Sequence, residues 1–313
     1  MMARKRRGRL IHGWVPIDKP KGWTSSQVTS KARRILDASK AGHGGTLDPM
    51  ATGVLPIAFG EATKTVSYVM NGKKRYRFTV SWGEERTTDD LEGEIKASSC
   101  HRPTKQNILT ILPEFIGTIE QVPPDFSAIK VAGERAYNLA RTGEEIFLSK
   151  RKVVVDEFCL LETPDKNHAI FEVLCGKGTY IRSLARDIAR RLDTVGYVSQ
   201  LRRTQCGPFS EKHSISLETL QTLVHSAPPS AYLLDVEAAL DDIPALTLNQ
   251  TQADHLRHGR PVRVQNSGGR SFLETSSLVE GDVFCAMADG KPVALARFAD
   301  GEIRAVRVLN VYI

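Results

Sequence analysis

The segment from residue 40 to residue 64, KAGHGGTLDPMATGVLPIAFGEATK, constrains the fold of this chain more than any other segment. It places a glycine-rich turn between a basic, helix-like segment and the apolar run VLPIAFG at 54–60. A short apolar run beside glycines is typical of a buried strand, although periodicity alone does not exclude a helical turn. The turn also holds one lone carboxylate, Asp48, in a chain whose formal net charge is +7.

Patterns along the rest of the chain indicate a mixture of strands and helices. Apolar residues that alternate with polar ones predict strands within 13–19, 73–83, 150–162 and 168–180. Apolar residues that recur every three to four positions predict helices within 24–36, 60–70, 104–116 and 180–193. Residues 123–143 predict an extended piece followed by a helix that ends at Gly143. The stretch ERTTDDLEGEI, at 85–95, has the composition of a solvated acidic turn.

The chain divides into three parts on composition. Residues 1–12 form a basic N-terminal arm, which contains the run RKRR. After residue 243 the sequence changes to short strand-like pieces separated by glycines, which predicts a small β module at 244–313. Residues 13–243 then form the main domain, and 313 residues suit roughly two domains.

Composition favours a polyanionic partner and a reducing compartment. The chain has 43 Lys and Arg against 36 Asp and Glu, and clustered cations neutralise phosphates. Its five cysteines are scattered, without the spacing of a zinc site or a disulfide framework, which favours the cytoplasm. No apolar run approaches the roughly 20 residues of a membrane-spanning helix. The basic N-terminus lacks the apolar segment of a secretory signal.

Asp48 allows two interpretations. An aspartate before proline is most often a turn-former whose side chain accepts nearby backbone amides. The alternative is a reactive carboxylate in apolar surroundings, kept ionised by a cation such as Arg182, which heads a predicted helix. Motifs for phosphate loops, dinucleotide sites, zinc proteases and serine hydrolases are not found, so we expect no metal or nucleotide cofactor.

Other candidates are weaker when judged from the residues alone. Tyr76 and Tyr180 could be strand residues of the core, or could stack on a flat base beside phosphate-binding cations. His43 lies between two glycines, which suggests exposure but little else. Lys19 and Lys64 each lie next to a turn, where a lysine is more often solvated than functional unless a phosphate is nearby.

Five blocks of the chain, taken together, resemble the bacterial TruB family of tRNA pseudouridine-55 synthases. In chain order they are GHGGTLDPMATGVLPIAFGEATK, KRYRFTVSWGEERTTDD, PPDFSAIKVAGERAYNLAR, GKGTYIRSLARDIA and LRR at 201–203. The resemblance runs from about Gly13 to Arg203 and is less distinct beyond. It implies an enzyme that isomerises one uridine in the T-loop of transfer RNA, at position 55, by base flipping and without a cofactor.

The resemblance also implies roles for particular residues. Asp48 would be the catalytic residue, Tyr76 would stack on the target base, and Arg182 would pair with Asp48, for which we expect a side-on contact through two parallel donors. The implied substrate contacts are Leu201 beside the base, His43 at the T-loop, Tyr180 in the Arg182 pocket, and Lys19 and Lys64 near phosphate or the active site. Gly44 replaces the Thr or Ala of many members, which predicts a looser turn.

The fold implied by the resemblance is α+β. It is the pseudouridine synthase fold, a mixed, largely antiparallel sheet with flanking helices, followed by a β module resembling a PUA-like RNA-binding domain that docks on the acceptor stem. The expected partner is transfer RNA. We expect the protein to bind it as a monomer and not to associate with a membrane. Two other functions stay open: a non-catalytic chaperone of transfer RNA folding, and a nucleosidase that uses Asp48 with Asp89 or Asp90.

Overall fold

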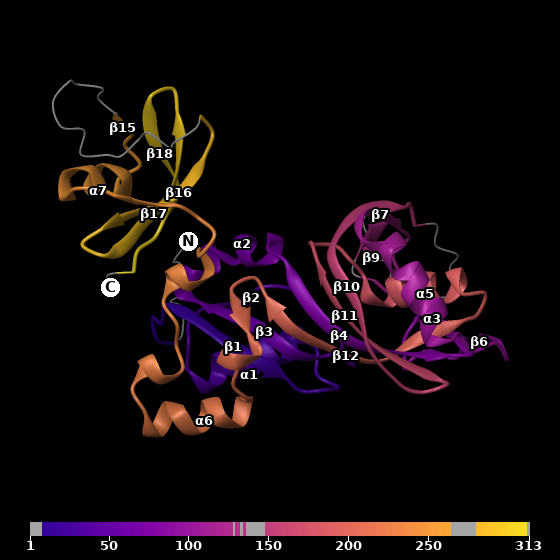
Figure 1. Ribbon diagram of the computed structural model, residues 1–313. Coiled ribbons are helices and arrows are strands. Elements are labelled where there is room, and N and C mark those ends of the chain that lie inside the picture. The colour runs from indigo at the N-terminus through magenta and orange to yellow at the C-terminus, as the bar shows by residue number, and fades with distance from the viewer. Residues whose placement is uncertain (1–7, 128, 132–133, 136–147, 264–279, 312–313) are drawn as a thin grey trace.

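A computed structural model describes residues 8–311 apart from 128, 132–133, 136–147 and 264–279. The predicted helix that ends at Gly143 and most of the basic arm lie outside the described residues. The model shows a large sheet with helices on it and a smaller β module beside it (Figure 1).

The large sheet has nine strands. Its main path is β1 (Gly13–Lys19), β3 (Thr52–Phe59), β12 (Gly196–Cys206), β4 (Lys74–Trp82), β11 (His168–Cys175), β10 (Arg151–Asp165) and β7 (Gly117–Gln121). β2 (Ala41–His43) pairs with β3, and β13 (Phe209–Ser210) pairs with β12. Only β3 and β12 pair in parallel, so the described sheet is mixed and largely antiparallel, as predicted.

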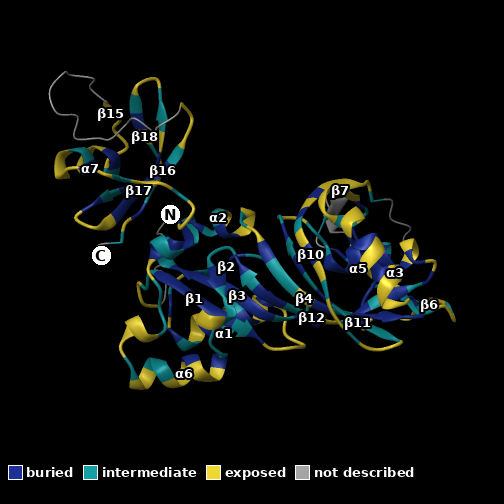
Figure 2. Ribbon diagram, in the orientation of Figure 1, coloured by how far each residue is buried: buried dark blue, intermediate teal, exposed yellow. Residues whose placement is uncertain are grey.

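Alternating side chains explain why the central strands are buried on one face. The strands of the large sheet are mostly buried or intermediate (Figure 2). In β4, Phe78 and Val80 are buried, whereas Thr79 between them is intermediate and Arg77 is exposed. Phe78 stacks on Phe171 of β11 with ring centroids 5.4 Å apart, and on Phe158 of β10 at 6.1 Å. This aromatic layer fixes the strand register around Tyr76, because a slip of one residue would expose the rings.

The helices and short hairpins surround this sheet. They are α1 (Ser25–Ile35), α2 (Val66–Asn71), α3 (Lys105–Ile111), α5 (Ile181–Arg191) and α6 (Leu217–Ser226), the 3-10 turns η1 (Gly60–Lys64), η2 (Leu112–Phe115), η3 (Glu211–His213), η4 (Pro229–Ala231) and η5 (Val236–Ala239), and the hairpins β5 (Glu84–Arg86) with β6 (Ile95–Ser98) and β8 (Lys130–Val131) with β9 (Glu134–Arg135). Thr24 caps α1, since its hydroxyl accepts from the Gln27 amide. α5 packs on β12 and β4.

The C-terminal module is a five-stranded sheet with one helix. Its order is β14 (Ala245–Thr247), β16 (Val283–Ala288), β17 (Lys291–Ala299), β18 (Glu302–Val308) and β15 (Val262–Arg263), and α7 (Gln250–Arg257) packs on it. Ala and Val residues of β16 and β17 form its separate core with Leu256 of α7. The curled sheet is consistent with the expected PUA-like module.

The end of the chain returns to the main domain. Leu309 is 1% exposed and lies in one apolar cluster with Trp14 and Val54 of the large sheet. The Asn310 amide donates to the Glu61 carboxylate at 2.7 Å. The chain therefore closes on η1 after it has completed the module.

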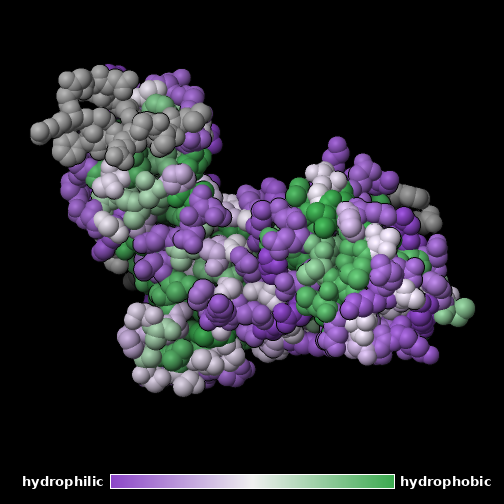
Figure 3. Space-filling view, viewed as in Figure 1, coloured by the Kyte–Doolittle hydropathy of each residue, from purple (hydrophilic) through white to green (hydrophobic). Residues whose placement is uncertain are grey.

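None of the described helices is long and apolar enough to cross a bilayer. The face drawn in Figure 3 is largely hydrophilic, with hydrophobic patches over α6 and over the side of the sheet that carries β7 and β10.

Candidate active site

Asp48 lies in the turn that joins β2 to β3, and neighbouring segments hold this turn on several sides. The Ser25 hydroxyl, at the start of α1, accepts from the Leu47 amide at 2.8 Å and donates to the Leu47 carbonyl at 3.1 Å. The Gly22 amide donates to the Pro49 carbonyl at 2.8 Å. The Asp48 side chain remains 35% exposed, so the turn presents a carboxylate that a substrate can reach.

Lys19 stabilises the same turn from inside the protein. Its residue is fully buried, and its Nζ donates to the carbonyls of Trp23 at 2.6 Å, Pro20 at 3.1 Å and Pro49 at 3.1 Å. Burial lowers the pKa of Lys19 to about 8, against the opposing charge of Asp48. The sequence placed Lys19 near phosphate or the active site, and Lys19 lies against the Asp48 turn with carbonyls around its ammonium. A contact between Lys19 and the substrate stays a prediction.

Arg203 holds both ends of the Asp48 turn. It is 1% exposed, and its guanidinium donates to the carbonyls of Gly45 at 3.0 Å and Val54 at 2.8 Å, with Thr46 at 3.5 Å. Its backbone crosses Gly53 so closely that a Cβ there would lie 2.2 Å from the Arg203 carbonyl oxygen. Residue 53, at φ +100°, must therefore be glycine.

Gly44 does not loosen the turn as its sequence position suggests. Its amide donates to the Pro56 carbonyl at 2.8 Å, and a Cβ at this position would lie 2.7 Å from Cγ1 of Val69. Glycine thus allows the turn to pack closely against α2.

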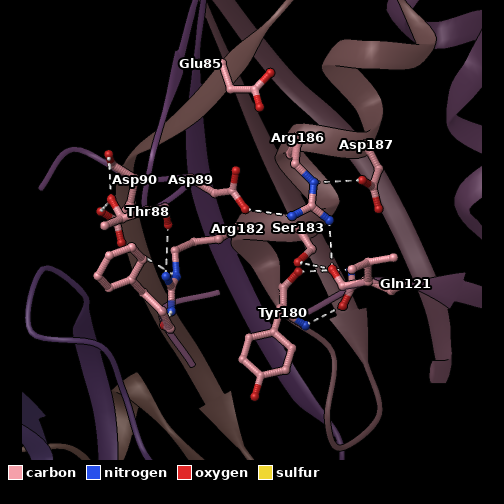
Figure 4. A network of polar contacts seen from close by, with 12 residues as sticks. Glu85, Thr88, Asp89, Asp90, Gln121, Tyr180, Arg182, Ser183, Arg186 and Asp187 are labelled. Carbon is pink, nitrogen blue, oxygen red and sulfur yellow. Dashed lines mark hydrogen bonds and ion pairs between the residues drawn. The ribbon is translucent and has the colours of Figure 1, made fainter. Parts of the chain in front are cut away.

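Arg182 joins three separate segments through its three nitrogens. Its Nε lies 2.9 Å from Oδ2 of Asp48, and its Nη2 donates to the Phe126 carbonyl at 3.0 Å. Its Nη1 donates to the Thr88 carbonyl at 2.9 Å (Figure 4). The Nε–H is not aligned with the Asp48 oxygen as a hydrogen bond requires. The expected pairing is present, but the expected side-on pair with two parallel donors is wrong, because backbone carbonyls take both terminal nitrogens.

Asp90 is part of this cluster, although the sequence suggested a solvated turn. Its Oδ2 lies 3.6 Å from the Nε of Arg182, and its side chain is 5% exposed. Its Oδ1 accepts from the Thr88 hydroxyl and from the Glu92 amide, at 2.5 Å and 3.0 Å. Polar composition had suggested exposure, whereas the buried guanidinium of Arg182 draws the carboxylate inward.

Tyr76 and Leu201 lie on adjacent strands. Tyr76 is opposite Arg203 in the pairing of β4 with β12, and Leu201 is opposite Phe78. Burial raises the pKa of the Tyr76 hydroxyl to about 12, and the charge of Arg203 opposes this rise. The Tyr76 residue keeps intermediate exposure, whereas Leu201 is 7% exposed. A partly exposed ring with a buried hydroxyl is suited to stacking on a base.

Tyr180 and His43 are both half-buried. Tyr180 precedes α5, and its amide and carbonyl make a reciprocal pair with the Gln121 side chain, at 2.8 Å and 3.0 Å. This fixes the start of the helix that carries Arg182. Burial, with the charge of Arg203, lowers the pKa of His43. The Nδ1 of His43 is buried without a partner among the described residues.

Lys64 is not brought into this cluster. Its Nζ contacts the Glu61 carboxylate at 2.6 Å and the Val308 carbonyl at 2.9 Å, where the module meets the main domain. Its contacts are those of a junction residue, and they give no support to a role beside Asp48. Within the part of the chain that the structure describes, no group of His, Cys, Asp and Glu side chains is arranged to hold a metal.

Solved structures share the whole fold. A chain of the Cbf5-Nop10-Gar1 complex is 27% identical, with a TM-score of 0.73 over 95% of this chain and 84% of that chain. A chain of the H/ACA RNP bound to a substrate RNA containing 2'-deoxyuridine has a TM-score of 0.74 at 24% identity, covering 98% and 91%. The fold is therefore that of the pseudouridine synthases, with its C-terminal module.

Sequence comparison narrows the class. Residues 33–181 match the TruB family pseudouridylate synthase N-terminal domain, and 182–241 match the tRNA pseudouridylate synthase B C-terminal domain. A tRNA pseudouridine synthase B of Rhodospirillum rubrum is 51% identical, covering 99% of this chain and 100% of that protein. One from Caulobacter vibrioides is 46% identical, covering 99% and 100%. The chain belongs to the TruB family of pseudouridylate synthases, so it is an isomerase, as its sequence blocks predicted.

Proposed function

We propose that this enzyme converts a uridine of the transfer RNA T-loop, at position 55, to pseudouridine, with Asp48 as the catalytic residue. The observation that carries the proposal is the Asp48 carboxylate, which is reachable from solvent yet lies 2.9 Å from a buried arginine. Relatives named for this activity on transfer RNA match the chain over almost its full length.

The reaction is an exchange of bonds within one nucleotide. The bond between C1′ and N1 breaks, the base rotates, and a bond forms between C1′ and C5. C5 then loses its proton and N1 gains one, so substrate and product contain the same atoms. Asp48 acts either by adding to C1′ or by removing a C2′ proton to give a glycal, and both routes need an ionised carboxylate.

The surrounding residues suit this task. Arg182 places a positive charge beside the Asp48 carboxylate. The Tyr76 ring would stack on the flipped base, with Leu201 beneath it, and both would keep water from the intermediate. A base that leaves its stack costs a few kcal/mol, which contacts to the RNA backbone offset.

Transfer RNA is the proposed partner. Exposed cations such as Arg33 and Arg34 on α1 would contact phosphates near the Asp48 turn. The C-terminal module would dock on the acceptor stem, and His43 would contact the T-loop. A monomer suffices for these contacts, and a substrate of this kind places the enzyme in the cytoplasm.

Two alternative functions make different use of the site. A folding chaperone of transfer RNA needs basic surface and aromatic rings, but it has no need of the Arg182–Asp48 contact. A nucleosidase would need a second accessible acid, and Asp90 is enclosed by Thr88, Glu92 and Arg182. The geometry therefore favours isomerisation by one exposed carboxylate.

The test is chemical mapping of pseudouridine in transfer RNA incubated with the wild type or with Asp48→Asn. The expected result is one modified T-loop uridine with the wild type and none with the variant, whose affinity for the RNA stays unchanged. A transcript with cytidine at that position is the substrate control. Release of free uracil would support a nucleosidase, and unchanged product from Asp48→Asn would remove the catalytic assignment.

A further inference from the structure

Three arginines on one face of α5 each meet an acidic residue. Arg182 meets Asp48 and Asp90, while Nη1 of Arg186 lies 2.8 Å from Oδ2 of Asp89. One turn further, Nη2 of Arg190 lies 3.0 Å from Oε1 of Glu85. The spacing of four residues thus sets a row of ion pairs between α5 and the hairpin that includes residues 84–90.

The middle pair is buried, unlike the last one. The Arg186 side chain is 10% exposed and that of Asp89 is 9% exposed, against 55% for Arg190. The remaining donors of Arg186 reach the Val122 carbonyl at 2.7 Å and the Asp187 carboxylate at 3.1 Å (Figure 4). Arg186 is therefore not available to RNA phosphates.

Asp89 lies in the chain between Thr88 and Asp90, the two residues of its loop that contact Arg182. The Thr88 carbonyl accepts from Nη1 of Arg182, and the Asp90 carboxylate lies beside Nε of the same side chain. Asp89 itself has a φ of +58°, a left-handed conformation that costs free energy in a residue other than glycine. Its backbone carbonyl also accepts from the Val198 amide of β12 at 3.1 Å.

The same two arginines hold a second segment. Val122 accepts from Arg186 and, at 2.8 Å, from the Ser183 hydroxyl, while Phe126 accepts from Arg182. The Thr88–Asp90 loop and the 122–126 segment each supply a carbonyl to Arg182. Arg186, one helical turn further along α5, also bonds to both of them.

We propose that the Asp89–Arg186 pair is a positioning pair, which holds the Thr88–Asp90 loop and the 122–126 segment where they aim the guanidinium of Arg182 at Asp48. This proposal rests on the proposed function of Asp48. Burying two charges costs several kcal/mol per ion, and apolar residues of similar size could fill the space equally well. Unlike apolar residues, the Asp89–Arg186 pair and its bond to the Val122 carbonyl fix the positions of the groups they connect.

The experiment measures single-turnover formation of pseudouridine at saturating enzyme, together with RNA affinity and thermal unfolding. The variants are Asp89→Asn, Arg186→Met, Arg186→Lys and the double variant Asp89→Asn/Arg186→Met, which leaves no lone charge buried. Arg190→Met is the matched control, because it removes an exposed arginine that also forms an ion pair from the same helix face.

We expect the rate to fall by about 10- to 100-fold in Asp89→Asn, Arg186→Met and the double variant, the size expected when a reacting group is misplaced by about 1 Å. RNA affinity should stay within about threefold. Arg186→Lys, which keeps the charge and one donor, should recover part of the rate, and Arg190→Met should match the wild type.

Three results would overturn the proposal. These are wild-type rates in the Asp89→Asn and double variants, losses that vanish on cooling well below the unfolding temperature, and weakened RNA affinity at an unchanged rate. Asp48→Asn, run alongside, separates the two hypotheses. Activity in Asp48→Asn would remove the catalytic assignment, whereas an inactive Asp48→Asn beside a fully active double variant would remove the positioning pair alone.

Discussion

Arg203 lies directly across from Tyr76 in the pairing of β12 with β4, and its guanidinium reaches the carbonyls on both sides of the Asp48 turn. One buried side chain therefore links the strand that carries the phenol to the turn that carries the carboxylate. This guanidinium donates to the backbone carbonyls of Gly45, Thr46 and Val54, and it also interacts with the Tyr76 hydroxyl. The planar fork of an arginine reaches carbonyls that lie apart on different segments, whereas a lysine offers all its donors from a single nitrogen.

Replacing Arg203 by Lys should reduce the single-turnover rate strongly, while the protein still folds. Lysine keeps the charge but offers one point donor, so the Gly45 and Val54 carbonyls cannot both stay bonded. The double variant Arg203→Lys/Tyr76→Phe, compared with each single variant, shows whether the two residues act together. Rates that multiply independently would contradict a link between the strand and the turn.

Tyr76→Phe should keep RNA affinity within about threefold and lose about 100-fold or more of the rate, the range for a group that transfers a proton. The ring, which stacks, is preserved, whereas the buried hydroxyl beside Arg203 is lost. Tyr76→Leu, which removes both, should weaken binding as well. If Tyr76→Phe turns over like the wild type, Tyr76 is a stacking platform and nothing more.

Arg182→Lys should be far from conservative. The three nitrogens of Arg182 serve three segments, and a lysine ammonium at one point cannot reach Asp48, Thr88 and Phe126 together. We expect the rate to fall by about 100-fold, with RNA affinity unchanged at every salt concentration.

The control for Arg182→Lys is Arg34→Ala, which removes an exposed cation of α1. This control should weaken RNA binding and reduce its dependence on salt, with little change in the single-turnover rate at saturation. A loss in Arg182→Lys that disappears at low salt would show that Arg182 contacts a phosphate instead.

The sequence predicted β1, β3, β4, β10, β11 and the turn, because they depend on local patterns, but it gave no prediction for β12 or β7. Apolar alternation in β4 and the glycines around Asp48 are readable within a dozen residues. The pairing of Arg182 with Asp48 came from the family resemblance, and the structure contains it. The direction of its donors depends on carbonyls of residues 88 and 126, which no local pattern relates to residue 182.

Burial of charge was the part that could not be predicted. The acidic stretch at 85–95 has a solvated composition, yet Asp89 meets Arg186 from 97 residues further along the chain. Lys19 ends a strand, as many surface lysines do, but the carbonyls of Pro20, Trp23 and Pro49 accept from its buried ammonium. Such burial follows from tertiary packing, which supplies partners that make a charged residue tolerable inside the protein.

Because of Asp89, the free energy of unfolding should decrease as the pH is raised from about 4 to about 6. Burial raises its pKa from 3.8 to about 6, despite the opposing charge of Arg186. The folded state then holds a proton that the unfolded state has lost, so this contribution is present below pH 4 and is lost as pH rises through 6.

Comparison with Asp89→Asn isolates this contribution. The free energy of unfolding of the wild type, taken relative to that of Asp89→Asn, should fall between pH 4 and pH 7 by at most about 3 kcal/mol. The measurement is chemical denaturation across this pH range, with Glu94→Gln, at an exposed position of the same hairpin, as the control. A wild type that is the more stable protein at pH 7 would show that the ionised pair is net stabilising.

Leu309→Ala should destabilise the main domain, although Leu309 follows the last strand of the C-terminal module. The side chain is 1% exposed and packs with Trp14 and Val54, so its removal leaves a cavity that costs about 2–5 kcal/mol. All three tryptophans of the chain, at positions 14, 23 and 82, lie in the main domain, so their fluorescence reports its unfolding. Val306→Ala, at a 43% exposed position of β18, is the control and should change little. Equal denaturation midpoints for Leu309→Ala and the wild type would show instead that the module and the main domain are stable independently of each other.

Removal of residues 244–313 also removes Leu309 from the core of the main domain. This deletion should therefore slow the reaction even on an isolated T-arm hairpin, which has no acceptor stem for the module to contact.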